Sequence, residues 1–354
     1  MTLLQETLQA ILPQDQEWRD QAKNRLDQLT MPHWALGRLM DLAVDLAGMT
    51  RSMNPPVSRK AVVTMAGDHG VVAEGVSKFP SEVTPQMVGN FVNGGAGINA
   101  LANQVGARVV VVDMGVAADL SAMAKSGKII DRKIAFGTSN MAKGPAMTRE
   151  QAVAAIEAGI DVARLLGGEI DLFGTGDMGI GNTTPSAAIV AAITGISVAT
   201  VTGRGTGLDD AQLDHKVKVI EEALKVNQPD PHDGLDVLAK VGGFEIGGIA
   251  GLILGAAAQR KPVLIDGFIS TAGALIASTI APSCRDYLIA SHRSVEQGHR
   301  IMHQHLQLEP LLDLNLRLGE GTGAALAMNL VEAACRILTE VATFEEAAVA
   351  TADK

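Results

Sequence analysis

The stretch "EIDLFGTGDMGIGNTTPSAAIVAAI", residues 169–193, predicts a strand, a glycine-rich loop and a helix in succession. Its glycines stand at 174, 176, 179 and 181, and Pro185 follows in what would be the first turn of a helix. A strand that passes through such a loop into a helix is the unit from which α/β folds with a parallel sheet are built. In such a fold the same alternation of strand and helix recurs along the chain.

Short runs rich in β-branched residues recur along the chain. Helix-like stretches at 96–104, 149–166, 209–226 and 243–258 separate most of these runs, which predicts a parallel sheet in a layered α/β domain. The runs are continuously apolar, as expected for strands that are covered on both faces. The expected strands are 60–67, 108–115, 169–176, 196–203, 261–268 and 287–292.

The two ends of the chain differ from its middle. Residues 1–50 and 293–354 have a helical pattern with no strand-like run between them. We expect these two segments to form a small, discontinuous helical domain beside a large α/β domain over 51–292. Most expected strands end in Gly, Asp, Thr or His, and ligands of open parallel sheets bind at the carboxyl ends of strands.

The composition limits the classes of function. The chain has 354 residues, of which 47% are hydrophobic and 19% charged, with a net charge of −10. The sequence has no cluster of Lys or Arg of the kind that would indicate nucleic-acid binding. The longest apolar run, 246–258, is too short to span a bilayer. The only two cysteines, Cys284 and Cys335, lack metal or redox spacing, so a cytoplasmic protein with free thiols is expected.

The loop at 174–184 suits a phosphate, because glycines expose backbone N–H groups and a helix begins just beyond. Gly174, Gly176 and Gly179 also match the dinucleotide fingerprint, but Arg204 stands where an acidic residue is expected after the next strand. A dinucleotide-dependent oxidoreductase, a non-catalytic nucleotide-binding protein and a plain strand-to-helix turn remain alternatives. A second glycine loop, 202–210, precedes a helix that carries Lys216.

Glu320 lies between two glycines in "LRLGEGTGAALAM", residues 316–328. No residue nearby in the sequence pairs with its charge. It is either an acidic residue at a helix start or a carboxylate kept free to take a proton. Burial would raise its pKa and the following helix N-terminus would lower it, and the sequence leaves that balance open.

Four motifs in order give the chain a family resemblance. The segments 66–87, 93–102, 176–188 and 316–328 together resemble nicotinate-nucleotide–dimethylbenzimidazole phosphoribosyltransferase. The resemblance implies transfer of phosphoribosyl from nicotinate mononucleotide to a benzimidazole base, giving α-ribazole 5'-phosphate and nicotinate in assembly of the cobalamin nucleotide loop. It also implies a Rossmann-like six-stranded sheet, a homodimer, and no metal or cofactor. The apolar, glycine-rich helix at 246–258 is a candidate for the dimer interface or for the core.

The resemblance also assigns roles to residues. Glu320 matches the catalytic base, and Asp177 matches an auxiliary carboxylate that is often a glutamate in the family. Residues that match the pocket for the base are Ser77, Phe79, Gln86, Met178 and Leu318. Residues that match the phosphate and ribose site are Gly179, Gly181, Asn182, Thr183, Gly203, Lys216, Asp266 and Ser291.

Overall fold

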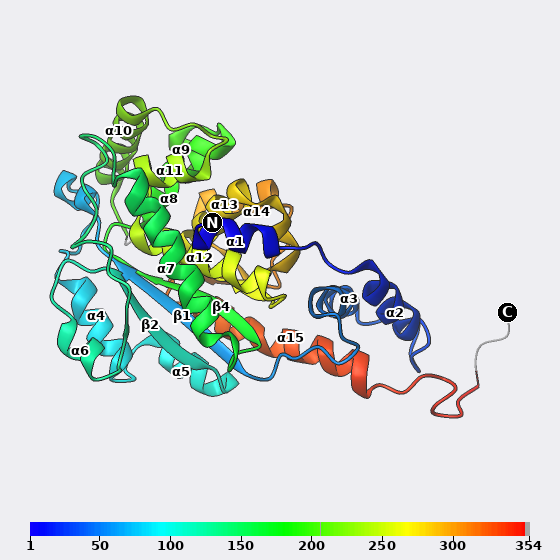
Figure 1. The fold of residues 1–354 in the computed structure, drawn as a ribbon. Coiled ribbons are helices and arrows are strands. Elements are labelled where there is room, and N and C mark those ends of the chain that lie inside the picture. The colour runs from blue at the N-terminus through cyan, green and yellow to red at the C-terminus, as the bar shows by residue number, and fades with distance from the viewer. Residues whose placement is uncertain (206, 351–354) are drawn as a thin grey trace.

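The computed structural model describes residues 1–205 and 207–350. Its core is a six-stranded, all-parallel sheet with the order β3-β2-β1-β4-β5-β6. This order confirms the expected Rossmann-like sheet (Figure 1). The strands are β1 (Lys60–Gly67), β2 (Arg108–Gly115), β3 (Ile130–Asp131), β4 (Leu172–Met178), β5 (Val263–Ile265) and β6 (Leu288–Ala290).

One expected strand is wrong. Residues 196–203 contain the short helix α9 (Val198–Val201), and the sixth strand of the sheet is the two-residue β3. Strand β4 already pairs with β1 and β5, so no edge beside it is open to the 196–203 run. Val198 and Val201 are instead buried, with α9 packed on neighbouring helices. Packing thus overrides the β propensity of this run, which is only a weak preference.

Helices cover both faces of the sheet. α12 contacts β1, β2, β4 and β5 together with α7 and α13, while α15 contacts β1, β4 and β5 together with α5 (Figure 1). The helices of the large domain are α4 (Val83–Val92), α5 (Gly97–Val105), α6 (Ser121–Lys125), α7 (Arg149–Gly167), α8 (Thr183–Thr194), α10 (Asp210–Asn227), α11 (Gly234–Val241), α12 (Phe244–Ala258) and α13 (Phe268–Ile280). Short 3₁₀ turns add η1 (Gly70–Glu74) and η2 (Pro282–Tyr287).

The glycine-rich helix α12 belongs to the core of the chain. Residues Phe244 to Ala257 are all buried, and a Cβ on Gly251 would overlap with the carbonyl oxygen of Ile156 in α7. The glycines therefore allow α7 and α12 to pack backbone to backbone. This placement rules the 246–258 helix out as a dimer interface. No helix among residues 1–205 and 207–350 is long and apolar enough to cross a membrane.

The chain ends pack partly together. α2 (Gln16–Leu26) and α3 (Arg38–Thr50) contact each other and α15 (Thr322–Glu340), and they lie apart from the sheet in Figure 1. Arg25 forms an ion pair with Glu346 at 2.9 Å across the two ends. α1 (Leu3–Ala10) contacts α7 and α12 instead, so the first helix packs on the helices that cover the sheet. The division into domains at residues 50 and 293 stays a prediction.

The expectation that residues 293–354 contain no strand is wrong. β8 (Leu312–Leu316) pairs in parallel with β7 (His292–Ser294) in a separate two-stranded sheet, and α14 (Gln297–Leu306) connects them. β8 is short and half exposed, and its alternation of leucines with Asp and Asn is a weak signal beside the helices around it.

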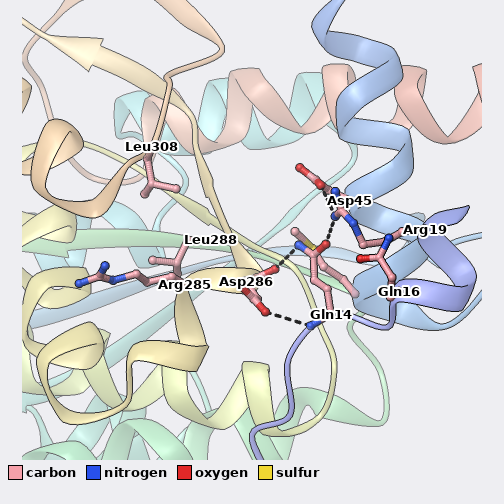
Figure 2. A pocket seen from close by; sticks show the side chains of 9 residues that line it. Gln14, Gln16, Arg19, Asp45, Arg285, Asp286, Leu288 and Leu308 are labelled. Carbon is pink, nitrogen blue, oxygen red and sulfur yellow. Dashed lines mark hydrogen bonds and ion pairs between the residues drawn. The ribbon is translucent and has the colours of Figure 1, made fainter. Parts of the chain in front are cut away.

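A polar cleft of about 420 Å³ lies where α2 and α3 meet η2 and β6. Figure 2 shows interactions that join Gln14, Arg19, Asp45 and Asp286. Gln14 Nε2 donates to the carbonyl oxygen of Asp286 at 2.6 Å, which attaches the segment before α2 to η2. Arg19 pairs with Asp45 at 2.5 Å, which joins α2 to α3.

Candidate functional site

A cavity of about 720 Å³ opens at the carboxyl end of β4. β1 and β4 are the central strands, and the chain order reverses between them, which is where open α/β sheets bind ligands. The cavity thus lies where the fold predicts it. Its lining residues are Phe79, Val83, Met87, Asp177, Met178, Gly179, Ile180, Asn182, Thr183, Gly205, Gly267, Phe268, Ile269, His292, Ser294, Glu296, Asn315, Leu316, Arg317, Leu318, Gly319 and Glu320.

One end of the cavity is built by the loop between β4 and α8. A Cβ on Gly179 would overlap with the carbonyl oxygen of Gly67, so only glycine lets the loop cross the end of β1 this closely. Asn182 is the N-cap of α8, but its side chain forms no cap bond and instead donates to Asp177 Oδ2 at 3.0 Å. The first turn of α8 therefore keeps its positive end available to an anion.

Lys216 reaches this loop from α10. Its side chain is 1% exposed, and its Nζ donates to Thr183 Oγ1 at 2.7 Å. Burial lowers the pKa of Lys216 to about 8. Lys216 lines a small hollow of about 50 Å³ with Ser77, Gly179, Gly181, Asn182, Thr183 and other residues. The structure thus brings together five of the expected phosphate-site residues, Gly179, Gly181, Asn182, Thr183 and Lys216, and places the expected base-pocket residue Ser77 beside them.

Glu320 lines the same cavity, on a turn between β8 and α15. Glu320 is 6% exposed and has a φ of +63°, an uncommon left-handed conformation for a residue with a side chain. Its Oε2 accepts a hydrogen bond from the backbone N–H of Ile98 at 2.9 Å. Burial raises the pKa of Glu320, and the N–H groups of Ile98 and Gly97 at the start of α5 partly oppose the rise.

The glycines on either side of Glu320 let the turn that carries it pack closely against the end of the sheet. Gly321 has a φ of +100°, and a Cβ there would overlap with Val62 of β1. The backbone oxygen of Glu320 also accepts a hydrogen bond from Thr64 Oγ1 at 3.1 Å. These contacts hold the carboxylate at the switch point between β1 and β4.

Asp266 lies next to the site without lining it. Its side chain is fully buried and is not part of the cavity lining, and the contact with the nucleotide that the family resemblance implies stays a prediction. Its carboxylate instead accepts the backbone N–H groups of Gly321, Gly323 and Ala324 at 3.2, 2.7 and 3.0 Å. Asp266 therefore caps α15 from a distant segment and fixes the turn that carries Glu320.

Asp177 is a second carboxylate in the cavity lining. It is 5% exposed, and among the described residues its Oδ1 has no hydrogen-bond partner. Burial raises the pKa of Asp177 well above its usual value, and the nearby charges of Asp266 and Glu245 raise it further. The raised pKa favours the protonated carboxyl, which can donate a hydrogen bond.

Three of the residues expected at the base pocket line the cavity. Met178, Phe79 and Leu318 supply apolar surface, and Phe79 and Leu318 are 49% and 60% exposed. Gln86 is not part of the lining: it is exposed on α4, and its helix neighbours Val83 and Met87 face the cavity instead. The spacing of Val83 and Met87, four residues apart, is the signal that identifies the inner face of α4.

Ser291 and Gly203 also lie outside the cavity lining. Ser291 is fully buried and its Oγ donates to the carbonyl oxygen of Ile265 at 2.6 Å, so it joins β5 to β6. Ser294, three residues later, lines the cavity. A Cβ on Gly203 would overlap with Glu296 Oε2, so Gly203 faces a lining side chain.

Sequence reasoning missed Ser294, Glu296 and Arg317 as lining residues. They lie on or next to β7 and β8, and that small sheet was not predicted. Arg317 directly precedes Leu318 in the quoted motif, which is the one signal that pointed to it.

Comparison with known proteins identifies relatives of the whole chain. A phosphoribosyltransferase family model matches residues 11–349. A relative from Syntrophotalea carbinolica, named nicotinate-nucleotide–dimethylbenzimidazole phosphoribosyltransferase, is 67% identical over 349 residues, which cover 99% of each chain. A relative of the same name from Geobacter sulfurreducens is 60% identical over 354 residues, which cover 100% of each chain.

Solved structures agree with these relatives. The crystal structure of nicotinate-nucleotide–dimethylbenzimidazole phosphoribosyltransferase from Thermus thermophilus is 46% identical to this chain, with a TM-score of 0.90. The match covers 96% of this chain and 100% of that chain.

Proposed function

The chain belongs to the nicotinate-nucleotide–dimethylbenzimidazole phosphoribosyltransferase family and is a pentosyltransferase, and we propose that it transfers phosphoribosyl from nicotinate mononucleotide to 5,6-dimethylbenzimidazole or a related base. The products are α-ribazole 5'-phosphate and nicotinate. The observation that carries this proposal is that Glu320 and the Gly179–Thr183 loop line one cavity. A proton acceptor and an anion cradle thus face the same space.

The donor enters with its phosphate at the start of α8. The N–H groups of the glycine loop, the Thr183 hydroxyl and the Lys216 ammonium supply donors and positive charge there. The acceptor base lies against the apolar side chains of Phe79, Met178 and Leu318. This arrangement puts the ribose between the two ends of the cavity.

In the reaction, the lone pair of one ring nitrogen of the base attacks the anomeric carbon of the ribose. The bond from that carbon to the nicotinate nitrogen breaks, and its electron pair leaves with nicotinate. The pyridinium nitrogen becomes neutral in this step, so departure of nicotinate needs no acid. Attack from the opposite face gives the α anomer.

Glu320 takes the N–H proton of the second ring nitrogen, which would otherwise leave the ring cationic. A carboxylate oxygen can accept more than one hydrogen bond, so the Ile98 contact leaves capacity for this proton. The raised pKa of Glu320 makes it a stronger base than an ordinary glutamate. We assign Asp177 the part of an auxiliary group that, when protonated, donates a hydrogen bond to the ribose or the base.

The test is to incubate the protein with nicotinate mononucleotide and a panel of bases, and to identify products by mass spectrometry. We expect α-ribazole 5'-phosphate with 5,6-dimethylbenzimidazole, and a much lower rate with nicotinic acid riboside, which lacks the phosphate. Equal turnover of the riboside and the nucleotide would rule out the phosphate cradle. Reduction of a nicotinamide cofactor by added substrates would favour an oxidoreductase instead.

We also infer a cytoplasmic homodimer. Cys284 and Cys335 are both free and buried, as is usual in a reducing compartment. Family membership supports the dimer, and exposed apolar side chains near the cavity offer surface for it, namely Phe79, Val295, Leu314 and Leu318.

A further inference from the structure

The side chain of Glu296 does not cap the helix that it precedes. It occupies the N-cap position of α14 but forms no side-chain cap bond. Its carboxylate is directed at the loop after α9: a Cβ on Gly203 would overlap with Oε2 and lie 3.3 Å from Oε1. Among the residues that the structure describes, the buried Oε2 has no hydrogen-bond partner.

The loop beside Glu296 also borders the phosphate loop. Burial raises the pKa of Glu296, while the positive charge of Lys216 and the backbone N–H of Gly205 lower it. Glu296 in turn raises the pKa of Lys216, against the larger effect of burial. Gly205 also lies beside the phosphate loop, because a Cβ there would be 3.0 Å from Thr183 Oγ1 and 3.5 Å from Lys216 Nζ.

The donors close to this loop are the groups that would bind a phosphate. Lys216, Thr183 and the glycine-loop N–H groups form one cradle, and Glu296 lines the cavity that opens onto it. A carboxylate and a phosphate at close range repel each other strongly when both are partly buried. The charge of Glu296 therefore opposes binding of a phosphate in the cradle.

We propose that the Glu296 carboxylate, which lines the cavity beside the phosphate cradle, is a like charge that lowers the affinity of the enzyme for the phosphate of the donor. The inference rests on the proposed function. Glu296 thus weakens binding of ligands that carry the phosphate and leaves binding of the riboside unchanged.

The test compares E296Q with the parent by isothermal titration calorimetry, using nicotinate mononucleotide, inorganic phosphate and nicotinic acid riboside as separate probes. The matched control is E169Q, which removes the same charge from an exposed residue before β4, at the amino edge of the sheet. We expect E296Q to bind the mononucleotide and inorganic phosphate about tenfold more tightly, since a like charge is removed. Riboside binding should stay within about twofold of the parent, and E169Q should match the parent for all three probes.

The other outcomes each decide against the inference. Unchanged or weaker binding of the mononucleotide and of phosphate by E296Q overturns it. Weaker binding of the riboside by E296Q shows that Glu296 accepts ribose hydroxyl groups instead, which also overturns it. If the parent itself binds neither the mononucleotide nor phosphate, the proposed function fails and the inference fails with it. Urea unfolding of E296Q alongside the parent separates these outcomes from a loss of folded protein.

Discussion

The Oε2 of Glu320 accepts a hydrogen bond from the backbone N–H of Ile98 at 2.9 Å, across 222 residues of sequence. Ile98 lies in the first turn of α5, which begins at Gly97 in the "NGGAGINALA" motif. The N-terminus of α5 thus binds the carboxylate of Glu320, which has no partner nearby in the sequence. The contact joins two motifs of this chain that lie far apart in the sequence.

Replacing Glu320 with Gln should slow phosphoribosyl transfer by roughly 10²–10⁴-fold, the usual contribution of a positioned general base. The amide oxygen can still accept from Ile98, so the free energy of unfolding should change by less than about 1 kcal/mol. In the parent, the rate should fall as the pH drops through a pKa above that of an ordinary glutamate, because burial raises the pKa of Glu320. Initial rates and urea unfolding measure both effects. A near-parent rate would contradict the role of Glu320 and direct attention to Asp177.

Replacing Asp177 with Asn should stabilise the protein. Burial raises the pKa of Asp177 well above its usual value, so the charged form is disfavoured in the folded state. The resulting cost is absent below the unfolded pKa, grows as the pH rises toward the folded pKa, and is constant above it. We therefore expect D177N to gain about 1–2 kcal/mol in free energy of unfolding at pH 8, and less at pH 5. Equal gains at both pH values would show that charge is not the cause.

Replacing Asp266 with Asn should destabilise the protein by about 1–3 kcal/mol, because three backbone N–H groups lose a charged acceptor. Transfer should also slow, since the cap fixes the turn that carries Glu320, while KM for nicotinate mononucleotide should change little. D233N is the control: Asp233 caps α11 through Leu235 and Asp236, so its loss should reduce stability without slowing transfer. A selective rise in KM for D266N would show that Asp266 contacts the nucleotide after all.

Binding of the donor should weaken above about pH 8. Burial lowers the pKa of Lys216 to about 8, so the ammonium that faces the phosphate is lost as the pH rises through that value. We expect KM for nicotinate mononucleotide to rise with pH in this range and to become independent of pH in K216Q. K218Q, which alters an exposed lysine on the same helix, should keep the dependence of the parent. A flat KM profile in the parent would place the phosphate away from Lys216.

Light scattering at micromolar concentration should give about twice the 36.8 kDa mass of one chain. Because α12 lies inside the chain, its glycines cannot form the interface. A Leu314→Asp change, which places a charge on an apolar side chain that is 55% exposed, should shift the mass toward that of the monomer if β8 is part of the interface. A monomeric parent at this concentration would refute the dimer.

Several expectations from sequence followed from local patterns and were confirmed. The runs at 60–67 and 108–115 form β1 and β2 with those bounds, because long, continuously apolar, β-branched segments suit strands buried on both faces. The helices expected at 149–166, 209–226 and 243–258 also form, within one or two residues at each end. The glycine loop between a strand and a helix at 174–184 also forms as expected, between β4 and α8, and its phosphate-binding role stays a prediction.

The remaining features depended on tertiary contacts. The 196–203 run became a helical turn because β1 and β5 occupy both sides of β4, and β3 and β8 are too short or too exposed to show a strand pattern. The sequence alone established a parallel α/β fold and indicated a glycine loop and Glu320 as parts of a candidate site. Only the tertiary structure decided that Asp266 caps α15, that Ile98 holds Glu320, and that Glu296 lies against Gly203. Hydrogen bonds and charge interactions depend on distance in space, and segments dozens to hundreds of residues apart come within that distance only when the chain is folded.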